Sequence, residues 1–334
     1  MPIRPAARMS YSAAGRSVLI DAKDDWSAHA VANVFAGWFL IPLDSQSVSD
    51  PAVTVHVQSG VAPPPVPSGL SSFEIIHGGI CHTDNHTYYV EFDGSLVIFG
   101  PDNFRETQLW VDKPEECSLA RLTLLLSHAL SPALRRSGVF EIHSGGVIAP
   151  GNSKAILIAG PSGSGKSTLT SQLTRCGWQY LSDDILLMIE VDEQIQVQAF
   201  RRFFALTAET LSAVNLSQAR SITLSGKQRV VPEDHFETVP VQHATAGLIC
   251  FPGITSESTT SIVAMTPSET MMRLLRLCPW ASYDKPTSAE HLRILGLLAH
   301  TTSAFELRAG ADVLREPEHV AAMLSELSSN VLSV

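Results

Sequence analysis

The pattern of apolar and polar positions is most regular in the middle of the chain. Ala155 to Ala159 is an unbroken apolar run, which is typical of a parallel strand covered on both faces. Apolar residues then recur at the spacing of one helix face (Leu169, Leu173 and Cys176), and Gly177 follows where a helix C-cap is expected. The pattern therefore predicts a buried strand, a turn and a helix.

The turn between this strand and this helix carries a complete phosphate-binding pattern, G-x-x-x-x-G-K-S. Its residues, with the threonine that follows, are Gly160, Pro161, Ser162, Gly163, Ser164, Gly165, Lys166, Ser167 and Thr168. The glycines let the backbone curl around phosphate groups, and the helix N-terminus adds unpaired amides and partial positive charge. Lys166 supplies a cation, and the Ser167 hydroxyl can ligate Mg²⁺. We therefore predict a nucleotide site that uses ATP and Mg²⁺.

A second predicted strand, Trp178 to Leu181, ends in Ser182 followed by the carboxylate pair Asp183 and Asp184. Carboxyl ends of strands in open α/β sheets are where ligands bind. Neighbouring residues on a strand point to opposite sides, so one carboxylate can hold Mg²⁺ and the other can accept a proton from a hydroxyl. Upstream, His143 follows Phe140-Glu141-Ile142 close to the loop in sequence, although a lone histidine is more often a structural hydrogen-bonding residue.

Three cationic side chains are weaker candidates for residues of the nucleotide site. Arg201 and Arg202 follow Val197 to Phe200. A cation there could stabilise a transferred phosphate or bind a peptide carboxylate, or it could be surface charge. Lys227 lies in a predicted hairpin over residues 220–231, as a hairpin-tip cation or as a phosphate or substrate contact. The segment from Leu224 to Arg229 also resembles the signature of ABC-transporter ATPases, but no strand ending in Asp-Glu follows it.

The remaining segments predict scaffold around this region. Residues 1–16 are small and polar, and we expect them to be frayed. Short strands and two helices are predicted before the loop, and a capping box (Thr266 to Glu269) opens the C-terminal helices. The predicted elements are strands over 17–21, 53–57, 73–76, 87–92, 95–99 and 302–307, and helices over 26–38, 114–136, 266–277, 287–298 and 318–327.

Residues 77–86 hold a group of potential metal ligands: His77, Cys81, His82 and His86. Zinc sites use such residues, but paired spacing on one element is absent. We therefore expect a polar loop between strands here.

Composition limits the partners. The chain has 334 residues, 45% of them hydrophobic, which is enough for a core. Its net charge is −10 with only 23 basic residues, which argues against nucleic acid as a partner. The five cysteines are scattered and odd in number, as expected of reduced thiols in a cytoplasmic protein. No apolar run has the length of a membrane span, so no membrane partner is expected.

The stretch HSGGVIAPGNSKAILIAGPSGSGKSTLTSQLTRCGWQYLSDD, from His143 to Asp184, resembles the core of the HPr kinase/phosphorylase family. That family has a histidine upstream of the loop, a G-x-x-x-x-G-K-S loop, and a strand that closes in Asp-Asp. The resemblance implies an α/β fold in which residues 138–334 form a phosphoenolpyruvate carboxykinase-like P-loop domain. Residues 1–137, which do not resemble the family, would form a smaller N-terminal α+β module for substrate recognition.

The resemblance also implies roles for the site residues. Asp183 is expected to act as the base on an acceptor hydroxyl, Asp184 to help hold Mg²⁺, and His143 to line the transfer site. The chain looks most similar to HPr-kinase-related proteins found beside lasso-peptide genes, which phosphorylate the C-terminal serine of a precursor peptide. We therefore expect an ATP-dependent serine kinase with a peptide partner. A metabolite kinase, a bare ATPase and a nucleotide-sensing module stay open, as does a homo-oligomer.

Overall fold

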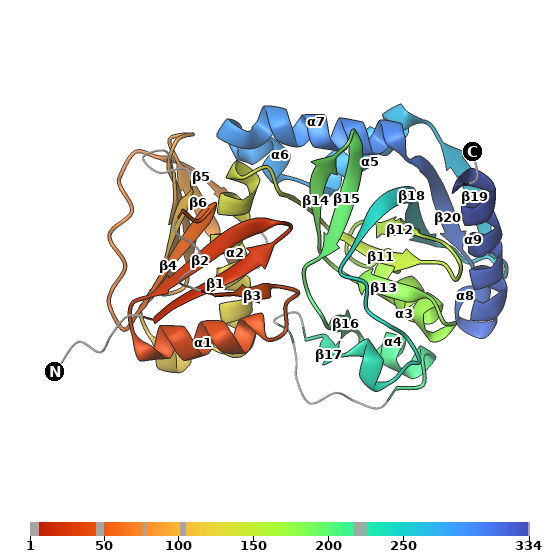
Figure 1. The fold of residues 1–334 in the computed structure, drawn as a ribbon, viewed down its shortest axis with the longest axis horizontal. Coiled ribbons are helices and arrows are strands. Elements are labelled where there is room, and N and C mark those ends of the chain that lie inside the picture. The colour runs from red at the N-terminus through yellow and green to blue at the C-terminus, as the bar shows by residue number, and fades with distance from the viewer. Residues whose placement is uncertain are drawn as a thin grey trace. The chain divides into compact units, whose positions relative to one another are not determined.

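The computed structural model describes residues 7–44, 50–75, 78–100, 105–216, 223 and 226–332. It has a mixed α/β fold, and the chain divides into two compact units (Figure 1). The first unit comprises Met1–Phe140 with Tyr283–Ala289, and the second comprises Glu141–Ser282 with Glu290–Val334. Within the described residues, no helix combines the length and the apolar character needed to cross a membrane.

The described part of the first unit is built on a nine-stranded mixed sheet in the order β3-β1-β2-β4-β9-β8-β7-β6-β5. The pairs β2–β4 and β4–β9 are parallel, and the other neighbouring strands in this order are antiparallel. Helices α1 (Asp25–Phe35) and α2 (Leu119–Arg136) pack on the sheet. The strands are β1 (Ala7–Ala13), β2 (Arg16–Ala22), β3 (Ile41–Leu43), β4 (Val53–Ser59), β5 (Ser71–Glu74), β6 (Ile80–Thr83), β7 (Tyr88–Phe92), β8 (Ser95–Phe99) and β9 (Glu106–Val111).

The expectation of a frayed start is wrong for residues 7–13. They form β1, which pairs with β2 from Ala7↔Ala22 to Ala13↔Arg16. The two residues between the strands, Ala14 and Gly15, have φ angles of 48° and 74°. Positive φ at both central residues is the geometry of a type I′ hairpin turn, which matches the twist of the flanking strands. Because the first position of the turn is alanine, the sequence does not carry the usual signal that predicts this type of turn.

The expectation of a polar loop at residues 77–86 is also wrong in part. Residues Ile80–Thr83 form strand β6, in which Cys81 is fully buried and His82 Nε2 lies 3.2 Å from Glu91 Oε2 on β7. His77 lies outside the described residues. Among the described residues, no group of three or more histidine, cysteine or acidic side chains comes together as a metal site would require.

The described part of the second unit contains another nine-stranded sheet. Seven strands run in the order β10-β14-β15-β18-β12-β11-β13, and β20 pairs with β18 and with β19. The contacts β12–β18 and β18–β20 are parallel. The strands are β10 (Phe140–Ile142), β11 (Ser144–Ile148), β12 (Lys154–Ala159), β13 (Gln179–Ser182), β14 (Leu186–Val191), β15 (Gln194–Ala199), β18 (His243–Ile254), β19 (Ser261–Met265) and β20 (Ser303–Ala309).

A short ribbon, seven α-helices and a 3-10 helix (Pro232–Asp234) complete the described chain after residue 140. The ribbon pairs β16 (Phe204–Leu206) with β17 (Gln228–Val230). The helices are α3 (Lys166–Arg175), α4 (Ala208–Ala213), α5 (Pro267–Leu277), α6 (Trp280–Tyr283), α7 (Lys285–Thr301), α8 (Asp312–Arg315) and α9 (Pro317–Leu332). The predicted capping box is confirmed, because Thr266 and Glu269 exchange side-chain and backbone hydrogen bonds at the start of α5.

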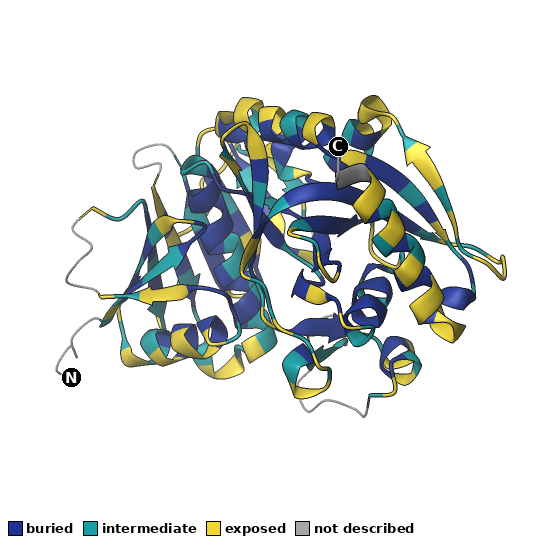
Figure 2. Ribbon diagram, turned by 45° about the vertical axis from the view of Figure 1, so that its right-hand side comes forward, coloured by how far each residue is buried: buried dark blue, intermediate teal, exposed yellow. Residues whose placement is uncertain are grey.

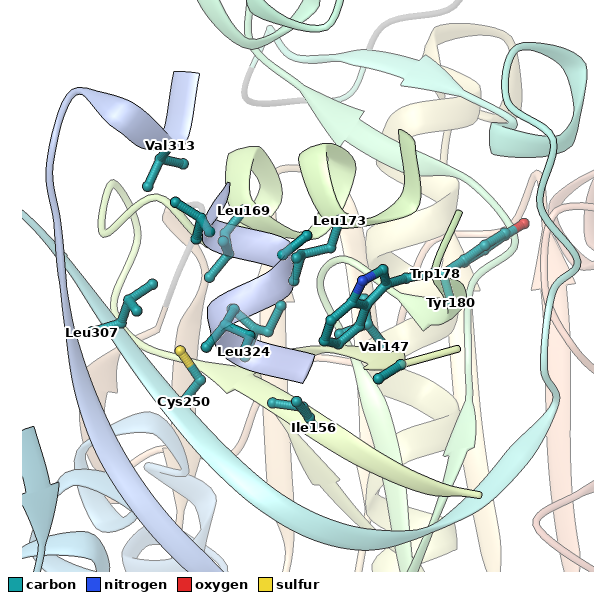
Figure 3. Close-up of a cluster of buried hydrophobic side chains, with 14 of the residues drawn as sticks. Val147, Ile156, Leu169, Leu173, Trp178, Tyr180, Cys250, Leu307, Val313 and Leu324 are labelled. Atoms are coloured by element: carbon teal, nitrogen blue, oxygen red, sulfur yellow. The ribbon is translucent and has the colours of Figure 1, made fainter. Parts of the chain in front are cut away.

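The core that supports the site lies between the sheet of the second unit and helices α3 and α9. Figure 3 shows Leu169 and Leu173 of α3 close to Leu324 of α9, with Ile156 of β12 and Trp178 completing the cluster. All of these side chains are buried, whereas exposed residues lie on the outward faces of the helices (Figure 2). Burying large apolar side chains stabilises this arrangement by about 2 kcal/mol each. The apolar pattern predicted from the sequence is therefore the face that fixes α3 on the sheet.

Candidate functional site

The sheet topology brings three chain segments to one edge. Strand β11 is antiparallel to both β12 and β13, so its first residue lies beside the last residues of the other two. Ser144 pairs with Ala159 on one side of β11, and Gly146 pairs with Ser182 on the other. Continuing these registers puts His143 next to the start of the glycine-rich loop (Gly160–Gly165), and Asp183 beside Gly145.

The glycine-rich loop has a backbone shape that needs its glycines. Gly163 and Gly165 have φ angles of 82° and 95°, in the left-handed region that other residues rarely adopt. A Cβ on Gly160 would lie 2.6 Å from the Ser164 Oγ, so any other residue at this position would force the Ser164 side chain to move. Pro161 and Ser162 in this loop are exposed to solvent. The loop is therefore a tight backbone turn whose outer surface is open to solvent.

Helix α3 begins directly after this loop, and its N-terminus is left open. Gly165 is the N-cap and has no side chain to accept a hydrogen bond from the first amides of the helix. The Lys166 Nζ lies back over the loop, donating to the carbonyl oxygens of Gly160 at 2.7 Å and Pro161 at 3.0 Å. Burial lowers the pKa of Lys166 to about 8, although the charge of Asp184 opposes this shift. The unpaired amides at the N-terminus of α3 and the buried Lys166 ammonium group therefore lie at the same end of the helix, as an anion-binding site requires.

The next two residues of α3 are partly buried. The Ser167 backbone oxygen accepts a hydrogen bond from Ser171 Oγ, and the Ser167 hydroxyl acts on the carboxyl group of Asp183. Thr168 Oγ1 lies 2.9 Å from Thr210 Oγ1 on α4, so Thr168 connects two helices. The contact with α4 explains the position of Thr168 without any ligand.

Gly145 on β11 sets how closely α3 approaches the carboxylate pair. A Cβ at this position would lie 2.7 Å from Thr170 Oγ1 on α3 and 3.2 Å from the Ser182 backbone oxygen. Both distances are shorter than carbon and oxygen atoms tolerate without movement. Because this residue is glycine, the helix packs directly on the strand backbone and brings Lys166 near Asp183 and Asp184.

Asp183 is buried, with 1% of its surface exposed. Its Oδ2 accepts a hydrogen bond from the backbone amide of Ala205 at 3.0 Å. Its Oδ1 is also buried and accepts no hydrogen bond of ordinary geometry from the described residues. Burial and the adjacent charge of Asp184 raise the pKa of Asp183 to about 6, although the Ala205 amide and the nearby Ser167 hydroxyl act in the opposite direction.

Asp184 lies in a different environment, with 26% of its side chain exposed. His143 Nδ1 lies 3.1 Å from Asp184 Oδ1, and Arg201 Nη1 donates to Asp184 Oδ2 at 2.9 Å. Burial opposes ionisation, but the contact with His143 and the charge of Arg201 outweigh it, so the pKa of Asp184 lies below its usual range. The two adjacent carboxylates therefore differ in basicity: Asp184 is held ionised, and Asp183 takes up a proton near neutral pH.

The contact between Arg201 and Asp184 follows from the β14–β15 hairpin. The hairpin register pairs Leu186 with Ala199. Two steps further along the antiparallel pair, the same register sets Asp184 opposite Arg201. The turn residues Asp192 and Glu193 have φ angles of 50° and 59°, so a two-residue turn fixes this register.

The other two predicted cations lie differently. Lys227 is partly buried, and its charge acts on Lys166, Asp183 and Asp184 together, lowering the pKa of each. Its backbone amide donates to Thr223 Oγ1 at 3.2 Å, and neighbouring parts of the predicted hairpin lie outside the described residues. Arg202 is exposed and acts instead on Tyr180. The site therefore gathers Lys166, Lys227, Arg201 and His143 around the carboxylate pair, but not Arg202.

This set of groups suits a hard cation together with an anion. The oxygen donors near the loop are the Ser167 hydroxyl and the carboxylates of Asp183 and Asp184, which is the donor type that Mg²⁺ prefers. Asp184 is ionised and partly exposed, and the unpartnered Oδ1 of Asp183 can accept a further bond. The chemistry of these oxygen donors fits Mg²⁺, although the described residues hold no group of three or more histidine, cysteine or acidic side chains gathered as a metal site.

Sequence reasoning missed two contributors. The Ala205 amide that binds Asp183 is a backbone group, and no residue type signals it. The contact of Arg201 with Asp184 depends on the hairpin register, which the sequence Asp192-Glu193 does not reveal because it lacks the usual Asn-Gly or Asp-Gly turn.

Comparison with known proteins adds little to this geometry. No protein-family model matches the chain, and no curated protein matches it. Among solved structures, the HPr(Ser) kinase/phosphatase from Coxiella burnetii is similar over 57% of this chain and 88% of its own, with 11% identity and a TM-score of 0.32. Values this low do not assign a fold or an activity.

Proposed function

We propose that this chain is an ATP- and Mg²⁺-dependent kinase that transfers the γ-phosphoryl group to a serine hydroxyl. The acceptor that we propose is the C-terminal serine of a lasso-peptide precursor. The observation that carries the proposal is the placement of an uncapped helix N-terminus and a buried Lys166 beside two carboxylates of unequal basicity. Phosphoryl transfer needs both parts: an anion cradle for the donor and a proton acceptor for the incoming hydroxyl.

The triphosphate would bind over the glycine-rich loop. The open amides of α3 and the Lys166 ammonium supply positive charge, and Lys166 needs only to leave the carbonyls of Gly160 and Pro161. Lys227 and Arg201 add positive charge close to the same point. Preorganised charges of this kind stabilise the charge that develops on the transferred group.

Ser167 and Asp184 would hold Mg²⁺. When bound, the ion neutralises charge on the outer phosphates of the donor. His143 contacts Oδ1 of Asp184 and Arg201 donates to its Oδ2, so the orientation of this carboxylate would be set before an ion binds.

Asp183 would accept the proton of the attacking hydroxyl at its Oδ1. In the step, the serine oxygen forms a bond to the γ-phosphorus while the bond between that phosphorus and the β,γ-bridging oxygen breaks, and ADP leaves. The hydroxyl proton moves to Asp183, whose raised pKa makes it a suitable acceptor near neutral pH. The hydrogen bond from the Ala205 amide keeps the carboxylate oriented through Oδ2.

The peptide acceptor is supported by the resemblance of His143 to Asp184 to the HPr-kinase-related proteins described above. Lys227, which lies beside the carboxylate pair, is a suitable contact for the phosphate or for an acidic group of the acceptor. A metabolite with a hydroxyl group would use the same carboxylates, so the acceptor must be tested directly.

The test is mass spectrometry of candidate precursor peptides after incubation with the protein, ATP and Mg²⁺. A mass increment of one phosphate on a C-terminal serine is expected, and it should be absent with the Lys166→Ala variant and when that serine is replaced by alanine. ATP consumption with no modified peptide would contradict the peptide acceptor and favour a metabolite kinase or an ATPase. Failure to bind or consume ATP would contradict the kinase itself.

A further inference from the structure

An exposed apolar side chain borders the glycine-rich loop. Ile254 ends strand β18 and is 70% exposed. A Cβ built on Gly165 would lie 3.5 Å from Ile254 Cγ1 and 3.8 Å from its Cδ1, so the isoleucine side chain lies in contact with the last residue of the loop. The strand end is close to the other end of the loop as well, because the Pro252 backbone oxygen lies 3.8 Å from a Cβ built on Gly160.

The scaffold that presents Ile254 is well fixed. The strand before it pairs with β20 up to Ile254↔Ala309, and the Thr255 amide donates to the Ala309 oxygen at 3.0 Å. The segment that follows is held by Asp312, which accepts hydrogen bonds from the Thr260 amide at 2.7 Å and from the Thr260 hydroxyl. An exposed apolar side chain on a fixed backbone can contact a ligand without the loss of backbone conformational entropy that ordering a loop would require.

Backbone groups of the same segment form hydrogen bonds that hold the segment in position. The Glu257 oxygen accepts from the Ala311 amide at 3.0 Å, and the Ser258 oxygen accepts from the Asp312 amide at 3.2 Å. These groups are therefore engaged with the α8 region. The Ile254 side chain can offer a neighbouring ligand an apolar contact but no hydrogen bond.

We infer that Ile254 forms the apolar contact for the nucleoside part, base or ribose, of the triphosphate bound at the glycine-rich loop. The inference rests on the proposed function, because it takes the phosphates to occupy the loop. A nucleoside is joined covalently to those phosphates, so an apolar side chain in contact with the loop lies within its reach and would meet it at high effective concentration. Base faces and ribose carbons are the apolar parts of such a ligand, and ligand sites use apolar side chains to cover them. Ile254 is thus a specificity-determining residue that separates nucleoside triphosphates from bare polyphosphate.

The experiment compares two probes, ATP and inorganic tripolyphosphate, by equilibrium binding at a fixed Mg²⁺ concentration. Removing the side chain beyond Cβ in Ile254→Ala should weaken ATP binding by about fivefold, because roughly 1 kcal/mol of apolar contact is lost. Tripolyphosphate binding should be unchanged, and Ile254→Leu should keep most of the ATP affinity. Met272→Ala is the matched control, since Met272 is 56% exposed on α5 and should affect neither probe.

The outcomes separate this inference from the proposed function. If Ile254→Ala leaves ATP affinity unchanged, or weakens both probes equally, Ile254 does not contact the nucleoside, while the phosphate site stands. If neither probe binds the unmodified protein, the proposed function and this inference both fail. Thermal unfolding of each variant checks the fold, and we expect the midpoint to be unchanged because the side chain is mostly exposed.

Discussion

Each unit buries a carboxylate near cations, and the two carboxylates differ in how fully their oxygens are hydrogen-bonded. In the first unit, Asp284 is fully buried and both of its oxygens are taken up. Arg135 Nε and Arg136 Nη1 donate to Oδ2 at 3.0 and 2.8 Å, and Arg136 Nη2 donates to Oδ1 at 2.9 Å. In the second unit, Asp183 lies next to Asp184, and its Oδ1 has no partner of ordinary geometry among the described residues.

The difference separates a structural ion cluster from a candidate for chemistry. A buried carboxylate with two guanidinium partners is satisfied, and it fixes the segment Tyr283–Ala289 in its unit. Tyr88 reinforces this by donating to the Tyr283 oxygen and accepting from the Lys285 amide, both at 3.0 Å. Two adjacent carboxylates cannot both be ionised without a cost, and Asp183 is the member of the pair that a ligand or a proton can complete, because Asp184 is already bound by His143 and Arg201.

The largest expected effect comes from changing the unsatisfied carboxylate. Asp183→Asn removes the proton acceptor but keeps an oxygen for the Ala205 amide, so phosphoryl transfer should fall by about a thousandfold. ATP affinity should change by less than about threefold, since Lys166 and the loop are intact. Single-turnover transfer and equilibrium ATP binding measure the two quantities, and transfer at an undiminished rate would show that Asp183 is not the base.

The same variant should not lose stability. The pKa of Asp183 is raised in the folded protein, so its favourable contribution is complete below its unfolded-state pKa and is lost as the pH rises through about 6. Asparagine does not ionise, and Asp183→Asn should therefore raise the free energy of unfolding at pH 7.5 by roughly 1 kcal/mol. Urea denaturation measures this, and a marked decrease would place Asp183 with Asp284 as a structural residue.

The satisfied carboxylate should respond in the opposite way. Asp284→Asn leaves two buried guanidinium groups with a neutral partner, and the free energy of unfolding should fall by about 3 kcal/mol. The transfer rate of the molecules that remain folded should be unchanged. Asp93→Asn is the matched control, because Asp93 is an exposed partner of Arg121 and should change the unfolding midpoint very little. Equal losses for both variants would contradict the structural role of the Asp284 cluster.

The pH dependence of transfer should report both titrating groups of the site. Asp183 must be deprotonated to act as a base, so kcat/KM should rise about tenfold per pH unit below about 6. Lys166 must be protonated to bind phosphate, so kcat/KM should fall above about 8. The acid limb should disappear in Asp183→Asn, and its persistence in that variant would assign the titration to another group.

A smaller effect is expected at the cations that hold Asp184. Arg201→Met should lower transfer by about tenfold, because Asp184 loses one of its two fixed partners and its pKa rises. Arg202→Met should change transfer by less than about twofold, since Arg202 is exposed and its charge acts on Tyr180. Equal effects of the two variants on transfer would show that net positive charge matters here and position does not.

The sequence predicted the central part of this arrangement because local signals agree there. The apolar run of β12, the glycines of the loop and the spacing of Leu169 and Leu173 each specify one element, and the carboxylate pair ends the next strand. The positions of Arg201 and of the Ala205 amide depend on hairpin registers and on chain folding over many residues. Such contacts are set by tertiary packing, which a single sequence does not display.

The first unit was less predictable for a related reason. Strands β1 and β6 carry polar residues on one face, and turns such as Ala14-Gly15 adopt a type I′ geometry without an Asn-Gly signal. Asp284 lies far in sequence from Arg135 and Arg136, so only the fold reveals that they form one cluster.

Isothermal titration of ATP with Mg²⁺ into the unmodified protein and into Lys166→Ala tests the central claim most directly. We predict one ATP bound per chain, with an affinity that falls by about a hundredfold when the buried cation is removed. Asp284→Asn, measured below its unfolding transition, should bind as the unmodified protein does. An unmodified protein that binds no ATP, or a Lys166→Ala variant that binds it equally well, would contradict the account.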